Sequence, residues 1–144
     1  LRSTFSIFYK VFQQLENYLF YDFETTGKGK KASPTSFGQS PNWEQILQVG
    51  AIVADENLQS TNKTINEFCR LRTSIIPQPG ALLTTKQGIK KALQAKYSSY
   101  DLIALINKTF IEWKDESPNS VFIGHNTIEF DESVLEYNLF NNLF

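Results

Sequence analysis

Three stretches in the first half of the chain have the hydrophobic patterns of β-strands. Residues 18–23 are almost entirely apolar, as in a central strand covered on both faces. Residues 46–54 form a second apolar run, and residues 61–73 alternate between apolar and polar positions. A short polar turn at 55–57 separates the last two runs. The pattern therefore predicts an antiparallel β-meander of three strands.

The next segments change to the 3.6-residue periodicity of helices. Residues 84–96 and 99–114 each place apolar side chains on one side, and Ser98 or Ser99 is a suitable N-cap for the second segment. Before them, the Pro-Gln-Pro-Gly sequence of residues 77–80 is expected to stop regular structure, because neither proline has a backbone donor.

The C-terminal part predicts one more strand and one more helix. Residues 121–126 have the composition of a short buried strand, and residues 129–143 of a closing helix. The inner face of this helix is expected to consist of Phe130, Val134, Tyr137 and Asn141. A helical crossover returns the chain to the same edge of the sheet, so the last strand should be parallel to the first. The fold class expected is α/β, with a mixed sheet and flanking helices.

The length of 144 residues is that of one ordinary domain. Residues 18–144 are expected to form it. Residues 1–17 are interpreted as an N-terminal extension that could be helical, because Phe5, Phe8 and Phe12 have helical spacing.

Composition narrows the classes of function. A net charge of −1 excludes the general positive field of a non-specific nucleic-acid binder, so any such binding must be local. The single cysteine, Cys69, has no internal disulfide partner and is expected to be a small core residue. No apolar run reaches membrane-spanning length, and a soluble cytoplasmic protein is expected.

The first strand ends in two carboxylates, Asp22 and Glu24, which are the candidate catalytic residues. Residues two apart on a strand project from the same face, so their oxygens should lie side by side. Asp131, in the first turn of the last helix, should reach the same edge, where the carboxyl ends of parallel strands meet. Oxygen ligands suit Mg²⁺ or Mn²⁺, and three converging carboxylates indicate a two-metal site.

Two segments resemble motifs of the DEDD 3′→5′ exonucleases, which have a ribonuclease H-like fold. Residues 21–27 (YDFETTG) resemble the first motif, and residues 124–131 (GHNTIEFD) the second. Residues 45–52 (QILQVGAI) and 77–84 (PQPGALLT) further resemble one member of this family that digests single-stranded DNA.

The resemblance implies specific roles. Asp22 would bridge two metal ions, Glu24 would bind the nucleophile-side ion, and Asp131 would bind the other. The implied substrate-binding residues, beside the 3′-terminal nucleotide, are Phe23, Thr25, Thr26 and Asn126. Asn126 would either help to orient the metal-binding residues without binding metal itself, or merely cap the last helix. The implied reaction releases 5′-mononucleotides from the 3′ end of single-stranded DNA, in a monomer that could meet a single-stranded-DNA-binding protein and act in DNA repair.

The third motif of these exonucleases, a His followed five residues later by an Asp, is missing from the chain. The sole histidine, His125, lies inside the second motif and is expected to have a structural or substrate-wall role. Truncation is the simpler explanation, so the chain is expected to be an N-terminal fragment of the exonuclease domain, inactive alone. The alternatives are a related DEDD ribonuclease or proofreading subunit, or a non-catalytic nucleic-acid-binding module.

The loop at 28–44 carries three lysines that either contact phosphates or are simply solvated.

Overall fold

The computed structural model describes residues 16–27, 45–86, 88–124 and 130–143. Residues 1–15 of the extension expected at 1–17, the lysine loop at 28–44, and His125 and Asn126 lie outside the described residues, and Asn17 belongs to the first strand. The elements, in chain order, are β1 (Asn17–Thr25), β2 (Ile46–Asp55), β3 (Ser60–Phe68), α2 (Pro79–Thr84), α3 (Ile89–Leu93), α4 (Ser99–Glu116), β4 (Val121–Ile123) and α5 (Asp131–Asn141).

The four strands form one mixed sheet in the order β3-β2-β1-β4. β2 is antiparallel to both β1 and β3, which confirms the predicted meander. β4 is parallel to β1 and pairs Tyr18 with Val121 and Phe20 with Ile123, which confirms the predicted crossover. The fold class predicted from the sequence is therefore the one observed.

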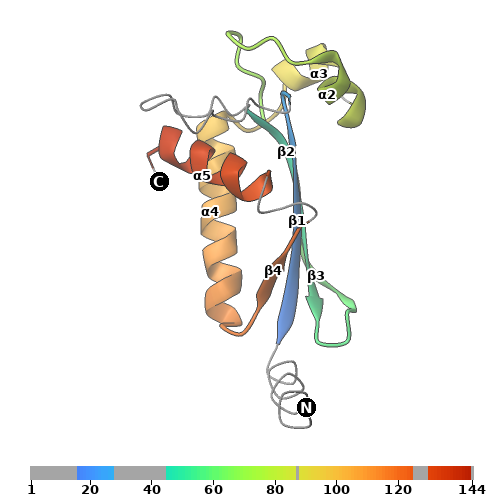
Figure 1. Ribbon diagram of the computed structural model, residues 1–144, viewed down its shortest axis with the longest axis vertical. Helices are drawn as coiled ribbons and strands as arrows, with labels where there is room; N and C mark the ends of the chain where they lie inside the picture. The colour runs from blue at the N-terminus through green and yellow to red at the C-terminus, as the bar shows by residue number, and fades with distance from the viewer. Residues whose placement is uncertain (1–15, 28–44, 87, 125–129, 144) are drawn as a thin grey trace, which may run out of the picture.

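The main core lies between one face of the sheet and the helices α4 and α5, which cover the same side of it (Figure 1). Leu19, Tyr21 and Phe23 of β1 point into this core, where Ile106 and Phe110 of α4 meet them. Tyr21 and Phe110 pack edge to face, with ring centroids 5.6 Å apart. This packing fixes β1 at the centre of the domain.

The opposite face of β1 is less covered than predicted for a central strand. Asp22 is exposed, and Tyr18, Phe20 and Glu24 are half-buried. A shallow hollow of about 810 Å³ lies on this side, lined by Phe20, Asp22 and residues of β2 and β4. No helix among the described residues fills it.

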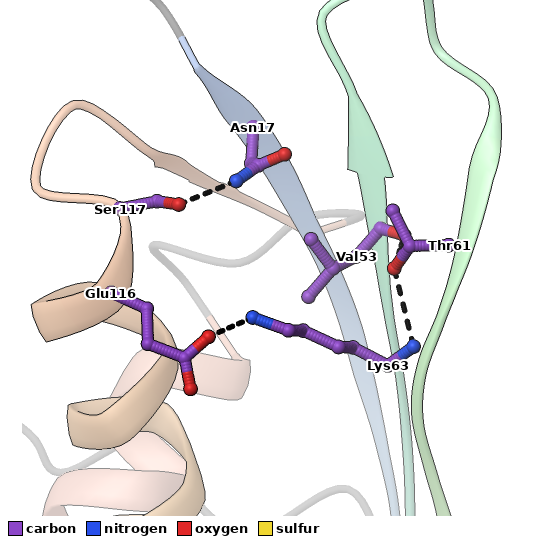
Figure 2. Close-up of polar contacts among 6 residues, drawn as sticks. All are labelled: Asn17, Val53, Thr61, Lys63, Glu116 and Ser117. Carbon is purple, nitrogen blue, oxygen red and sulfur yellow. Dashed lines mark hydrogen bonds and ion pairs between the residues drawn. The ribbon is translucent and has the colours of Figure 1, made fainter.

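Polar contacts fasten the C-terminal end of α4 to the sheet (Figure 2). The Asn17 side-chain amide donates to the Ser117 hydroxyl at 2.6 Å, and Lys63 of β3 pairs with Glu116. At the start of α4, Ser98 and Asp101 form a reciprocal capping box, which confirms one of the two predicted caps. The C-terminal end of α4 is thereby joined to both β1 and β3.

The predicted helix at 84–96 is wrong. Within that range only α3 is a helix, because α2 already ends at Thr84 and Lys86, which follows it, has a positive φ of 52°. Residues 77–80 do not stop regular structure either, because Pro79 starts α2, where its missing N–H has no intrahelical partner to lose.

Two strands and one helix face also differ from expectation. β3 ends at Phe68 rather than near residue 73, because Leu71 turns away to pack on Leu47 and Ala92. β4 is not buried, since Val121 and Phe122 remain 38% and 37% exposed. Of the predicted inner face of α5, Val134 is buried and Phe130 packs against the core, whereas Tyr137 is only half-buried and Asn141 is exposed. The other buried residues of α5 are Asp131 and Asn138.

Candidate metal centre

Asp131 reaches β1 at the point where β4 has ended. β4 pairs with β1 only as far as Phe20, so the edge of β1 beyond that residue has no strand partner from β4. There the Phe23 N–H donates a hydrogen bond to Asp131 Oδ1 at 3.1 Å. Asp131 is 1% exposed and lies in the first turn of α5, where the helix dipole favours a negative charge. The structure thus joins the two segments that carry the candidate carboxylates.

The environment of Glu24 is negative. Burial raises the pKa of the Glu24 carboxyl above its usual value, and the charges of Asp22 and then Asp131 raise it further. Charge repulsion among three carboxylates is what a bound cation would relieve, and oxygen donors suit a hard divalent ion. The donor chemistry therefore fits Mg²⁺ or Mn²⁺.

The chemistry of the three carboxylates suits a metal ion better than their positions do. Asp22 is exposed on the open face of the sheet, whereas Asp131 is buried at the strand edge. Within the part of the chain that the structure describes, no three His, Cys, Asp or Glu side chains are arranged so that they could hold a metal ion. The charges of Asp22 and Asp131 both act on Glu24, but the role of the three carboxylates as joint ligands stays a prediction.

A cavity of about 340 Å³ adjoins Glu24. This volume is at the lower end of the range for small-molecule sites. β1 supplies Phe23, Glu24 and Thr25, α2 supplies one wall, and Phe130, just before α5, also lines the cavity. The lining residues contributed from the start and body of α2 are Gln78, Gly80, Ala81 and Thr84. The cavity is therefore assembled from three separate segments around one carboxylate.

Thr25 and Thr26 occupy different positions at the end of β1. Thr25 lines the cavity, and its hydroxyl donates to the Gly27 carbonyl. Thr26 is fully buried, its hydroxyl accepts a hydrogen bond from the Gln45 N–H at 3.0 Å, and its carbonyl accepts one from the Gln78 N–H at 2.8 Å. Substrate contact by either threonine stays a prediction. Thr26 also has a structural role, because its two hydrogen bonds tie the start of β2 and the start of α2 to β1.

Gln45 is a structural residue of the site that sequence reasoning did not single out. Its amide nitrogen donates to Cys69 Sγ at 3.0 Å and to the Arg70 carbonyl at 2.7 Å, and its amide oxygen accepts from the Arg72 N–H at 3.0 Å. The side chain is 4% exposed. Cys69 itself is buried, as predicted, and burial raises the pKa of its thiol. A polar residue just before an apolar strand was the available signal, but such residues are common at strand ends.

A bulge in β2 lies beside Glu24. Glu24 pairs with Gln48, but the next residue of β1, Thr25, pairs with Ile46, so Leu47 has no partner of its own. Both Ile46 and Leu47 are buried, one in the main core and the other in a small cluster with Leu71 and Ala92. The bulge therefore lets β2 anchor both the helix layer and α3 next to the site.

Replacing Glu24 by glutamine is expected to stabilise the metal-free chain at neutral pH, by less than about 1 kcal/mol because the carboxylate is only half-buried. A carboxyl whose folded pKa lies above its unfolded pKa loses stability as pH rises from the unfolded to the folded value. The difference between wild type and Glu24→Gln should therefore vanish at pH values below the ordinary Glu range. Urea unfolding from about pH 3.5 to about pH 8 measures this difference, with the exposed Glu136→Gln as a control. Equal stability of wild type and Glu24→Gln at neutral pH would contradict the repulsion.

The sequence of the chain is similar to those of known proteins. No family model matches the chain. It is 24% identical to exodeoxyribonuclease I of Escherichia coli over 132 residues, which is 92% of this chain and 24% of that protein. It is 23% identical to the Haemophilus influenzae protein of the same name over 107 residues, 74% of this chain and 22% of that one. The chain thus spans about a quarter of the length of the curated relatives it matches.

Solved structures of exonuclease I have the same fold. The E. coli enzyme in complex with a dT13 oligonucleotide aligns with a TM-score of 0.69 at 23% identity, over 90% of this chain and 24% of that one. An exonuclease I from Methylocaldum szegediense also gives 0.69, at 25% identity, over 89% and 24%. The chain therefore has the fold of the part of exonuclease I with which it aligns. Sequence and fold together make the chain a distant relative of exodeoxyribonuclease I.

None of the described helices combines the length and the hydropathy that a membrane crossing requires.

Proposed function

We propose that this chain supplies the carboxylates and the nucleotide pocket of a 3′→5′ exonuclease that acts on single-stranded DNA. The observation that carries the proposal is the hydrogen bond from the Phe23 N–H to Asp131, which brings residues 108 positions apart to one end of β1. The distant relationship to exodeoxyribonuclease I supports the same function, since the E. coli protein has been crystallised with a DNA oligonucleotide.

In this proposal Asp22, Glu24 and Asp131 hold divalent cations, two in the complete site. Bound Mg²⁺ or Mn²⁺ would activate water and neutralise charge on the scissile phosphate. The chain's own residues hold and orient the end of the substrate. The 3′-terminal nucleotide enters the cavity beside Glu24, with Phe23 and Thr25 against it, while Thr26 keeps the strand end in place.

Phe130 has a position suited to a stacking contact, because it is half-buried and lines the cavity. Aromatic stacking on a base is tolerant of sequence, which suits an enzyme that removes any nucleotide from an end. Asn126 remains a candidate for positioning on resemblance alone.

A non-catalytic nucleic-acid-binding role is the second candidate. It is favoured by one observation, namely that the described residues do not arrange three potential ligands for a metal ion. In that case the domain would keep the pocket and the fold but not the chemistry. A partner such as a single-stranded-DNA-binding protein is also a proposal, suggested by a relative whose structure is described as a complex with the SSB C-terminus.

The test uses the product of the whole gene that encodes this chain. Single-stranded DNA and a short RNA of equal length, each labelled at the 5′ end, are incubated with Mg²⁺ or Mn²⁺ and resolved at single-nucleotide resolution. The proposal predicts a ladder that shortens from the 3′ end, and faster digestion of DNA. Preference for RNA would point to a ribonuclease of the same type, and binding without cleavage would favour the second candidate.

A further inference from the structure

Positive charge is concentrated in one segment of this weakly acidic chain. Between Glu67 and Asp101 there are six Lys or Arg residues and no carboxylate, whereas the whole chain has a net charge of −1. This segment contains α2 and α3. A local positive field therefore exists where the composition of the whole chain gives no sign of one.

The two arginines of the segment have structural roles. Arg70 donates from Nε to the Ala95 carbonyl and from Nη2 to the Lys96 carbonyl, both at 3.1 Å. Arg72 donates from Nη2 to the Ser99 hydroxyl at 2.8 Å. These bonds fasten the exit of α3 to the segment that follows β3.

α3 is also fixed through its buried side. Ala92 is fully buried against Leu47 and Leu71, and its carbonyl accepts a hydrogen bond from the Leu71 N–H at 2.9 Å. The orientation of α3 on the domain is thus determined by Ala92 and the arginines. Its lysines are not needed for that purpose.

Lys86, Lys90 and Lys91 are exposed and have no carboxylate partner among the described residues. The ion pairs within that part of the chain join Lys63 to Glu116 and Lys108 to Glu112, both far from α3 in the sequence. The ammonium groups of Lys90 and Lys91 on α3, and of Lys86 between α2 and α3, are therefore available to an anion. We call these three residues the lysine surface.

The lysine surface adjoins the cavity beside Glu24. α2 contributes Gln78 and Thr84 to the wall of the cavity, and Lys86 follows two residues after Thr84. α2 and α3 lie together beyond the end of the sheet at which β1 finishes (Figure 1). A polymer that starts in the cavity and leaves it over α2 therefore reaches the lysine surface next.

We propose that the lysine surface binds the phosphodiester backbone of a single-stranded nucleic acid whose 3′ end occupies the cavity. The polarity of the strand rests on the proposed function, whereas the charge contact does not. Ammonium groups act as point charges on phosphates and require no fixed base sequence. Leu83 and Ile89, 79% and 52% exposed on the same two helices, offer apolar contacts to bases.

The experiment compares two double variants of the full chain with equal loss of charge. Lys90→Gln/Lys91→Gln removes two members of the lysine surface, and Lys63→Gln/Lys108→Gln removes two paired lysines elsewhere. Lys86→Asn is added in a triple variant, because Asn tolerates the positive φ at that position. Binding of a fluorescent oligothymidylate is measured by anisotropy across a series of NaCl concentrations.

The slope of log K against log salt should fall by about 1.4 in the Lys90/Lys91 variant and by about 2 in the triple variant, since each phosphate contact contributes about 0.7 for single strands. The Lys63/Lys108 control should keep the wild-type slope. The proposal is overturned if the wild type does not bind the oligonucleotide, if both double variants lose the same slope, or if an acidic peptide displaces DNA and binds these lysines more tightly.

A second titration separates this inference from the proposed function. Binding of dTMP with Mn²⁺ probes the cavity alone and should be unchanged in all lysine variants. Loss of slope without any binding of dTMP and Mn²⁺ would reject the proposed function and keep the lysine surface. If dTMP and Mn²⁺ bind but the salt dependence of oligonucleotide binding is the same in the lysine variants as in wild type, the lysine surface is rejected and the proposed function is kept.

Discussion

Replacing Gln45 by alanine is expected to lower the free energy of unfolding by about 3 kcal/mol. The substitution removes three hydrogen bonds made by one buried side chain, to Cys69, Arg70 and Arg72. It leaves the Arg70 carbonyl and the Arg72 N–H without these partners, and a buried polar group without a partner costs about 1–3 kcal/mol. Because domains of this size have a total stability of about 5–15 kcal/mol, the variant should be markedly less stable.

Gln48→Ala is the matched control for this substitution. Gln48 lies three residues further along β2, and its amide donates to Asn66 at 2.9 Å on an exposed part of the sheet. Its loss should change the free energy of unfolding by less than about 0.5 kcal/mol. Urea denaturation followed by tryptophan fluorescence measures both, and equal destabilisation by the two variants would show that the Gln45 side chain has no special part in joining the start of β2 to the segment after β3.

The second large effect concerns Asp131, and it separates folding from chemistry. Asp131→Asn keeps an oxygen to accept the hydrogen bond from Phe23 but removes the charge, so the fold should be retained. Asp131→Ala removes the acceptor as well and should cost about 1–3 kcal/mol, because the Phe23 N–H then loses its buried partner. In the whole gene product both substitutions should lower 3′→5′ hydrolysis by at least about 100-fold, since removing even a supporting group of a metal site typically costs about 10–100-fold.

Thermal unfolding and the hydrolysis assay are measured on the same preparations. Glu136→Gln, exposed in the middle of the same helix, serves as the control and should leave both quantities unchanged. If Asp131→Asn folds normally and hydrolyses DNA at the wild-type rate, Asp131 is only a structural acceptor, and its assignment as a metal ligand is wrong.

The sheet could be predicted because the hydrophobic pattern within each strand segment is by itself that of a β-strand. The observed bounds of β1 and β2 differ from the predicted ones by two residues or fewer, and the parallel pairing of β4 with β1 follows from the crossover. α4 was predicted within two residues, since its apolar periodicity and its cap agree. Where pattern and chemistry indicate the same element, the structure contains it.

The region after β3 could not be predicted because tertiary contacts determine it. The alternation that continues to Leu71 looks like a strand, but Leu71 is apolar because it packs on α3. The helical pattern of 84–96 contains no breaker at Lys86, whose left-handed conformation has no signal in its own residue type. β4 was misjudged as buried because three apolar residues in a row do not reveal whether a strand lies at the edge of a sheet.

The carboxylates of the candidate site were predicted from the sequence, but the residues that form the cavity around them were not. The sequence places Asp22 and Glu24 on one strand and Asp131 at a helix start, and the structure brings Asp131 to the edge of that strand. Gln78 and Phe130 were missed as cavity walls because only the fold brings α2 and α5 to the same end of β1. Whether the three carboxylates bind metal together depends on geometry that neither motif encodes by itself.

The most direct test of that central point is a titration of the chain with Mn²⁺, with the free ion followed by electron paramagnetic resonance. Wild type should deplete the free-ion signal. Asp22→Asn should weaken binding at least about tenfold with the fold intact, because Asp22 is exposed and has no role in the core. Asp22→Asn is compared with the surface variant Asp115→Asn, which should bind as wild type does. Equal Mn²⁺ binding by wild type and Asp22→Asn, or none by either, would contradict a metal centre at the end of β1.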